Sequence, residues 1–140
     1  MGVPILTTRT AAVAVLLILG GCGQGGTSGG QAQDRFAGLD GQILNWRTEI
    51  IAVDPLCKSQ AKDQKCQSFE VACKAERVVT PADQAKGITA HVVAAISWDG
   101  FDPKLKQVQA GSRAAEFTKS AAGWARTDHA PVNMTTCADL

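Results

Sequence analysis

The chain has 140 residues, with 14 basic and 13 acidic side chains and five cysteines. This length leaves room for one folded unit at the usual size of about 100–200 residues per domain. A formal net charge of +1 and the lack of any Lys/Arg run argue against the clustered basic face of nucleic-acid-binding proteins, so we expect no nucleic-acid partner. The odd cysteine count means that one thiol needs an explanation other than an intramolecular disulfide.

Residues 1–21 have the parts of a secretory signal in the right order. Arg9 precedes an unbroken apolar run over residues 11–19. This run is far shorter than the roughly 20 residues needed to span a bilayer, but it suits the h-region of a signal peptide, about 7–15 residues. We therefore interpret residues 1–21 as a signal that is removed.

The next residues explain the odd cysteine. Leu19-Gly20-Gly21-Cys22 resembles the lipobox of bacterial lipoproteins, in which an aliphatic residue and two small residues precede a lipid-modified cysteine. The resemblance covers residues 1–22 only, and it implies cleavage after Gly21 and acyl chains such as palmitate on Cys22. Two or more acyl chains give stable membrane anchoring where one does not.

The residue after the cysteine bears on localisation. In Gram-negative lipoproteins an Asp at this position usually signals retention in the inner membrane, whereas here the residue is Gly23. The resemblance therefore implies attachment to the periplasmic face of the outer membrane.

The mature chain is expected to have two parts. Residues 22–33 comprise the lipidated cysteine and a glycine-rich, uncharged stretch that has nothing to bury, so we expect a flexible tether. Residues 34–140 have the charge content of an ordinary globular domain. Without Arg9, basic and acidic side chains are equal in number.

An amphipathic helix is the clearest local prediction. Apolar side chains recur at spacings of three and four residues and form one stripe, which we expect to face the core. Leu44 and Ile51 widen the stripe. Asp40 is a good N-cap, with Asp34 as an earlier alternative, and Asp54 ends the helix because it precedes a proline. The stripe consists of Phe36, Leu39, Ile43, Trp46, Ile50 and Val53.

Two strands follow in the prediction. Residues 68–76 alternate with the period of a half-buried strand, which places Glu70 and Glu76 outward as solvated charges. Residues 88–98 form the second strand, and Asp99-Gly100 gives a turn signal. The inward side chains of the first strand are Phe69, Val71, Cys73 and Ala75. In the second strand, one face carries Val92, Ala94, Ile96 and Trp98, and the other carries His91, Val93, Ala95 and Ser97.

Residues 113–127 fit two structures. Four apolar residues have helical spacing, but Gly123 suits a turn between arms at residues 116–118 and 124–127, so we favour a hairpin. The helical spacing is that of Ala114, Phe117, Ala121 and Trp124.

The predicted fold class is α+β, with one N-terminal amphipathic helix packed on a small antiparallel sheet of three or four strands. This element order resembles cystatin-like and NTF2-like folds, although no motif carries that resemblance. It implies a cup between helix and sheet.

Cys57, Cys66, Cys73 and Cys137 remain after Cys22 is assigned to lipid. An oxidising compartment favours two disulfides. We expect Cys57–Cys66 and Cys73–Cys137; the alternatives are Cys57–Cys73 with Cys66–Cys137, and Cys57–Cys137 with Cys66–Cys73. A meander would bring Cys57, Cys66 and Cys137 to one end of the domain. The spacings lack C-x-x-C, so we expect no metal site.

The sequence offers little catalytic chemistry. His91 lies within the second predicted strand, as a residue of the sheet surface, and His129 lies in a loop beside Asp128. No G-x-S-x-G motif surrounds Ser97 or Ser120. An enzyme that uses His91 or His129 is the least favoured interpretation, and we expect no cofactor.

Three tryptophans, Trp46, Trp98 and Trp124, supply bulk for the core or line a ligand pocket between helix and sheet. We favour the core. The sequence thus predicts a lipoprotein with a non-catalytic role in binding a protein or envelope component. The alternative is a lipoprotein that binds a small ligand in such a pocket.

Overall fold

The computed structural model describes residues 35–59, 61 and 65–140, and the predicted signal, lipobox and tether lie outside them. The described residues form a four-stranded antiparallel sheet in the order β1-β2-β3-β4, with helices, so the predicted mixed α+β class is confirmed. The elements are α2 (Leu39–Val53), the 3-10 helix η1 (Pro55–Cys57), β1 (Gln67–Glu76), α3 (Pro81–Ala85), β2 (Ala90–Asp102), β3 (Gln107–Ser120) and β4 (Gly123–His129).

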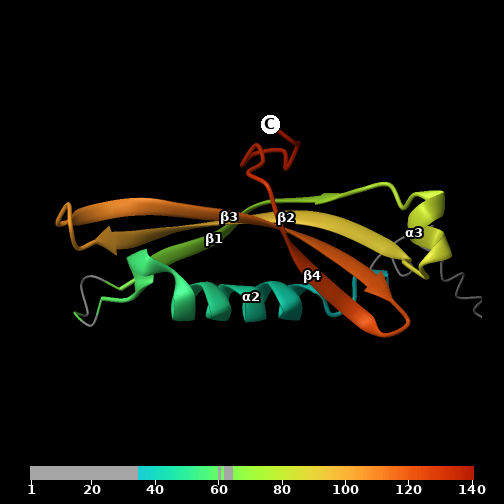
Figure 1. The fold of residues 1–140 in the computed structure, drawn as a ribbon, viewed down its shortest axis with the longest axis horizontal. Helices are drawn as coiled ribbons and strands as arrows, with labels where there is room; N and C mark the ends of the chain where they lie inside the picture. The colour runs from blue at the N-terminus through green and yellow to red at the C-terminus, as the bar shows by residue number, and fades with distance from the viewer. Residues whose placement is uncertain (1–34, 60, 62–64) are drawn as a thin grey trace, which may run out of the picture.

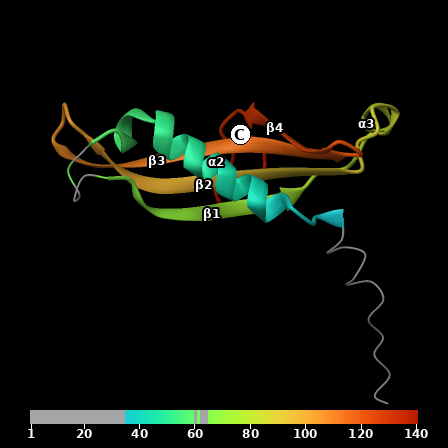
Figure 2. The ribbon, with the colours of Figure 1, turned by 90° about the horizontal axis from the view of Figure 1, so that it is seen from below.

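Helix α2 lies along one face of the sheet (Figures 1 and 2). Four of the six side chains of its predicted stripe are buried together with one face of β2 and β3, while Phe36 is partly buried. The β2 residues of this core are those predicted to share a face with Trp98. Trp46 meets the ring of Phe117 edge-on, with 5.8 Å between ring centroids. The buried residues of this core are Leu39, Ile43, Trp46, Ile50, Cys57, Val92, Ala94, Ile96, Trp98, Ala115 and Phe117.

The helix differs from the prediction at its start and in the width of its stripe. It begins at Leu39 after Gly38, which has a left-handed conformation (φ 86°) and gives no side-chain cap, so Asp40 lies inside the first turn rather than at the N-cap. Leu44, Ile51 and Val53 are exposed. The sheet covers only a narrow strip of the helix, which leaves these flanking side chains in solvent.

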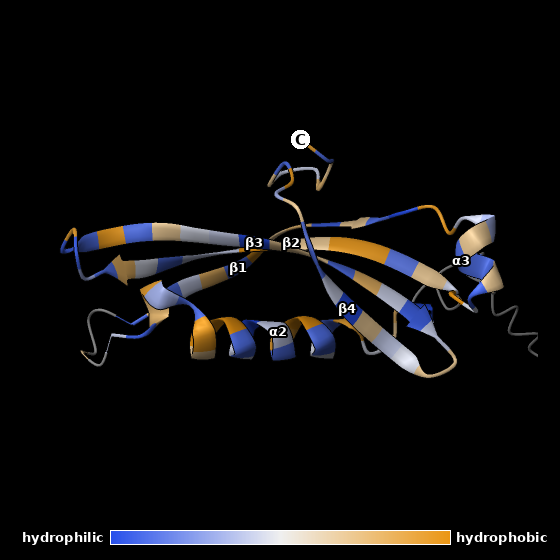
Figure 3. Cartoon of the chain, viewed as in Figure 1, coloured by the Kyte–Doolittle hydropathy of each residue, from blue (hydrophilic) through white to orange (hydrophobic). Residues whose placement is uncertain are grey.

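The opposite face of the sheet is also buried. The chain after β4 folds back over it (Figure 1), and Val132 and Cys137 pack on side chains from three strands. Figure 3 shows apolar stretches along β2, the strand that is covered on both faces. The strand residues in this second core are Cys73, Val93, Ala95 and Ala114.

Strand β1 does not keep the alternation predicted for it. Its register with β2 shifts twice, once between Gln67 and Glu70 and once between Val71 and Cys73. Each extra residue is a bulge that turns the following side chains to the other face. Phe69 therefore packs in the core beneath α2, while Cys73 packs in the second core.

The predicted turn at Asp99-Gly100 is wrong, since β2 continues to Asp102. A Cβ at Gly100 would lie 2.5 Å from the Cβ of Leu56, so this glycine allows η1 to approach the strand. The predicted hairpin of residues 113–127 is confirmed as β3 and β4, with Gly123 (φ 105°) at the start of β4.

Candidate functional site

The four described cysteines form two disulfides, Cys57–Cys66 and Cys73–Cys137, which is the favoured pairing. The first closes the loop that follows η1. The second joins the centre of β1 to the C-terminal segment, with 5.6 Å between the two Cα atoms. Cys137 therefore lies over the sheet face rather than at the end of the domain with Cys57 and Cys66, because the segment after β4 turns back across the strands.

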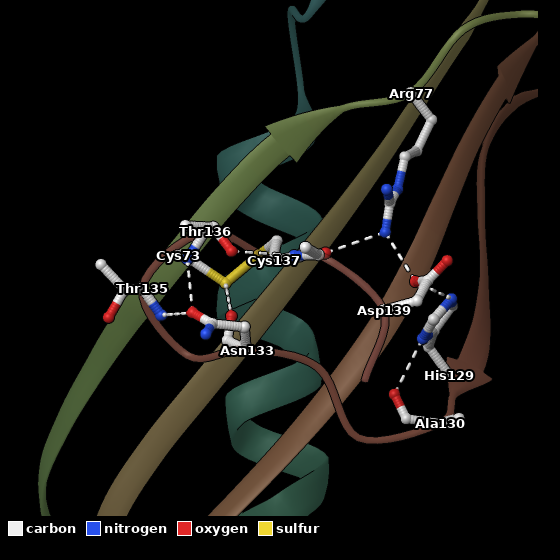
Figure 4. Close-up of a disulfide and its surroundings, with 10 residues drawn as sticks. Cys73, Arg77, His129, Ala130, Asn133, Thr135, Thr136, Cys137 and Asp139 are labelled. Carbon is white, nitrogen blue, oxygen red and sulfur yellow. Dashed lines mark hydrogen bonds and ion pairs between the residues drawn. A yellow bond between two sulfur atoms is a disulfide. The ribbon is translucent and has the colours of Figure 1, made fainter.

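The C-terminal segment is held at a second point by charge (Figure 4). Arg77 Nη2 donates to the carbonyl of Cys137 at 2.8 Å and to Asp139 Oδ1 at 2.7 Å. The Nε2 atom of His129 lies 3.7 Å from the same Asp139 oxygen, and its Nδ1 lies 2.8 Å from the carbonyl of Ala130. The carboxylate beside His129 is thus Asp139 rather than the neighbouring Asp128, a pairing that only the folded-back segment creates.

His91 has a different environment. Its Nε2 pairs with the carboxylate of Glu116 on β3, and the side chain is only 17% exposed, so it is not the exposed sheet-surface residue that the sequence predicts. Its Nδ1 is buried and makes no hydrogen bond within the described residues. Each histidine therefore contacts a carboxylate, as the base of a catalytic triad does, but within the described residues neither is hydrogen-bonded to a Ser, Thr or Cys nucleophile.

The three tryptophans all pack in or against the core under α2, each through a different contact. Trp46 and Trp98 are buried in the core under α2. Trp98 stacks on Phe69, with 5.6 Å between ring centroids. Trp124 is partly buried, and its Nε1 donates to the carbonyl of Ala37 at 2.9 Å. It thereby joins β4 to the turn before α2.

A hollow of about 550 Å³ lies at the start of α2 beside β1. Two ion pairs lie at the edge of this hollow. Lys74 pairs with Asp40 at 3.1 Å, and Arg35 pairs with Glu76 at 2.9 Å. The bulges in β1 put Glu76 on this face, whereas Glu70 accepts a hydrogen bond from Ser97. The sequence predicts both glutamates as solvated charges on one face of the strand. The apolar and glycine lining comprises Phe36, Ala37, Gly38, Leu39, Gly41 and Val92.

Within the described ranges, no group of three or more His, Cys, Asp or Glu side chains is placed to hold a metal ion. None of the helices in this part of the chain has the length and hydropathy needed to cross a bilayer. Comparisons with protein-family models, with curated proteins and with solved structures find no match for this chain.

Proposed function

We propose that the chain is a lipoprotein anchored by Cys22 to the periplasmic face of the outer membrane, where it has a non-catalytic binding role. The observation that carries this proposal is the lipobox-like sequence Leu19-Gly20-Gly21-Cys22. The disulfide-bonded domain that follows is consistent with it, because disulfides persist in oxidising compartments such as the periplasm.

The environment of the histidines supports a non-catalytic role. His129 and Arg77 share Asp139 and hold the C-terminal segment to the sheet. His91 pairs with Glu116 between two adjacent strands. Both side chains therefore have a structural use, and a catalytic role would need a nucleophile or substrate group within hydrogen-bond reach.

The anchor is tested by labelling cells that express the full chain with radioactive palmitate. We expect label on the wild-type protein and on a matched tether variant, Thr27→Ser, and none on Cys22→Ser. Label that persists on Cys22→Ser would overturn the assignment. Crosslinking in the intact envelope with the wild-type protein then identifies the binding partner.

The hollow beside α2 favours a second function, the binding of a small ligand. Its volume lies within the range of ligand pockets, roughly 300–1,000 Å³. A Cβ at Gly41, which lines the hollow, would meet no atom within 4 Å, so Gly41→Phe adds bulk there without a backbone clash. Native mass spectrometry should find a copurified small molecule on the wild-type protein that Gly41→Phe lacks. A wild-type protein with no bound mass would contradict this second function.

A further inference from the structure

The long β2–β3 ladder separates two ends of the domain. It runs from the pair Ala90↔Lys119 to the pair Asp102↔Gln107, which at about 3.4 Å per residue is roughly 40 Å. The first described residues lie at the Lys119 end, because Lys119 Nζ donates to the carbonyl of Arg35 at 3.1 Å. The β2–β3 turn lies at the opposite end, as both Figure 1 and Figure 2 show.

Four lysines gather at that far end, which we call the distal tip. Lys104 and Lys106 are in the β2–β3 turn, and Lys58 and Lys65 lie inside the loop closed by Cys57–Cys66, each next to one of the cysteines. This disulfide loop lies beside strand β2, since a Cβ at Gly100 of β2 would lie 3.3 Å from Cys66 Sγ. We define the distal tip as Lys58, Lys65, Lys104, Leu105, Lys106 and Val108, all of them exposed.

The tip lysines are available for a partner. Among the described residues, no ion pair joins any of the four to a carboxylate. The nearest acid in the turn, Asp102, uses its Oδ1 to accept the backbone N–H groups of Lys104 at 2.8 Å and Leu105 at 3.1 Å. The carboxylate thus shapes the turn, and the four lysines are exposed.

Exposed apolar side chains lie close to these charges in the sequence. Leu105 and Val108 are 58% and 59% exposed, although nothing in the fold requires a leucine at the apex of a turn. Lys106 has a left-handed backbone (φ 54°), a conformation that glycine or asparagine adopts at lower cost. A lysine at this position therefore strains the backbone and costs folding free energy. This cost points to a use for its charge.

We propose that the distal tip docks on an anionic phospholipid surface. Lysines beside exposed apolar side chains suit the headgroup region of such a membrane, where ammonium groups meet phosphates and the apolar groups enter the acyl boundary. A soluble polyanion would use the lysines but not Leu105 or Val108. The direction of docking rests on the proposed function: with Cys22 in one membrane, the tip faces a second surface.

Vesicle tethering tests the proposal with the full lipidated chain. The protein is placed in phosphatidylcholine vesicles and mixed with dye-labelled acceptor vesicles that contain phosphatidylglycerol. We expect the acceptors to be captured, and capture to fall as salt rises. The variant Lys104→Gln/Leu105→Ser/Lys106→Gln should weaken capture about 30-fold, at roughly tenfold for each 1.4 kcal/mol and about 1 kcal/mol for each lysine.

Two variants separate docking from folding. Lys106→Gly relieves the backbone strain, so the protein should be at least as stable in urea and yet capture fewer acceptors. The variant Val78→Ser/Lys86→Gln removes an exposed valine and a lysine near α3, away from the turn, and should capture as the wild type does. Equal capture of pure phosphatidylcholine acceptors, or no loss in the triple tip variant, would overturn the proposal.

A third arm keeps docking distinct from anchoring. The Cys22→Ser full chain, which has no acyl chain, is sedimented with phosphatidylglycerol vesicles with and without the tip substitutions. If the tip substitutions reduce binding, docking is supported even if labelling disproves the lipid anchor. If the tip substitutions leave binding unchanged, docking is overturned even if the anchor is real. If dextran sulfate binds the wild type and a Leu105→Ser variant equally, and vesicles do not bind, the partner is a soluble polyanion instead.

Discussion

Gly111 lies against the indole ring of Trp98, its partner across the β2–β3 ladder. A Cβ at Gly111 would be 2.3 Å from Cε2 of Trp98. The ring has little room to move, because Trp98 is 3% exposed and stacks on Phe69. The absence of a side chain at Gly111 therefore determines how closely the tryptophan packs on the strand.

Gly111→Ala is expected to destabilise the protein by about 1–3 kcal/mol, the usual cost of forcing extra volume into a packed core. The measurement is the free energy of unfolding in urea. Gly41→Ala is the control, since a Cβ there meets nothing within 4 Å and alanine in a helix is favoured by up to about 1 kcal/mol. Similar stabilities for the two variants would show that Trp98 can move away from the strand.

The two disulfides should contribute unequally to stability. Cys73–Cys137 links residues 64 apart and Cys57–Cys66 residues 9 apart. In the chain-entropy model, the longer loop is worth about 4 kcal/mol and the shorter somewhat under 3 kcal/mol. Replacing both cysteines of a pair by alanine should therefore cost more for the longer loop, as measured by urea unfolding without reductant. Equal losses would contradict a contribution set by loop length.

Asp54 is a buried carboxylate with two partners. It is 8% exposed, accepts the Leu56 backbone N–H at 3.0 Å and pairs with Arg113 at 3.1 Å. Asp54→Ala removes the N-cap of η1 and leaves the Leu56 backbone N–H without its acceptor. We therefore expect the free energy of unfolding to fall by about 2 kcal/mol.

Asp54→Asn keeps an oxygen for the Leu56 N–H and should cost less than Asp54→Ala. Glu49→Ala is the matched control, because Glu49 pairs with Arg126 from a 60% exposed side chain and such pairs contribute about 0–1 kcal/mol. If Glu49→Ala lowered the free energy of unfolding as much as Asp54→Ala, the burial of Asp54 would not explain its contribution to stability.

The sequence predicted the elements better than their relation to one another. The apolar periodicity of α2 and the alternation of β2 were enough to identify the core between them. Both patterns are formed by residues close together in the sequence, so they can be read without the fold. The faces of β1 were missed at Cys73, because a bulge inserts a residue without any change in local composition. The second core was missed because Val132 and Cys137 lie in a segment with no periodicity. Their place on the sheet depends on long-range contacts, namely the Cys73–Cys137 disulfide and the contacts of Arg77.

The same distinction holds for the candidate sites. Pairing of His129 with Asp139, and of Arg35 with Glu76, joins residues from separate elements. Sequence spacing could not reveal them. The distal tip was likewise hidden, because no predicted helix or strand covers residues 104–111 and Lys58 and Lys65 reach the same end only through the fold.

Asp83 offers a test by pH. Thr80 donates to it through Oγ1 at 2.7 Å and through the backbone N–H at 3.0 Å, and these bonds lower the pKa of the carboxyl below its ordinary 3.8. Because the pKa is lower in the folded state, the two hydrogen bonds stabilise α3 fully at pH values above the ordinary pKa. This stabilisation is lost as the pH falls through the lowered pKa. NMR titration of the Asp83 carboxyl should show this, and Thr80→Ala should return the pKa toward 3.8. Thr89→Ala, which removes a hydroxyl bonded to the carbonyl of Lys119, should leave it in place; an Asp83 pKa that ignores Thr80→Ala would contradict the capping interaction.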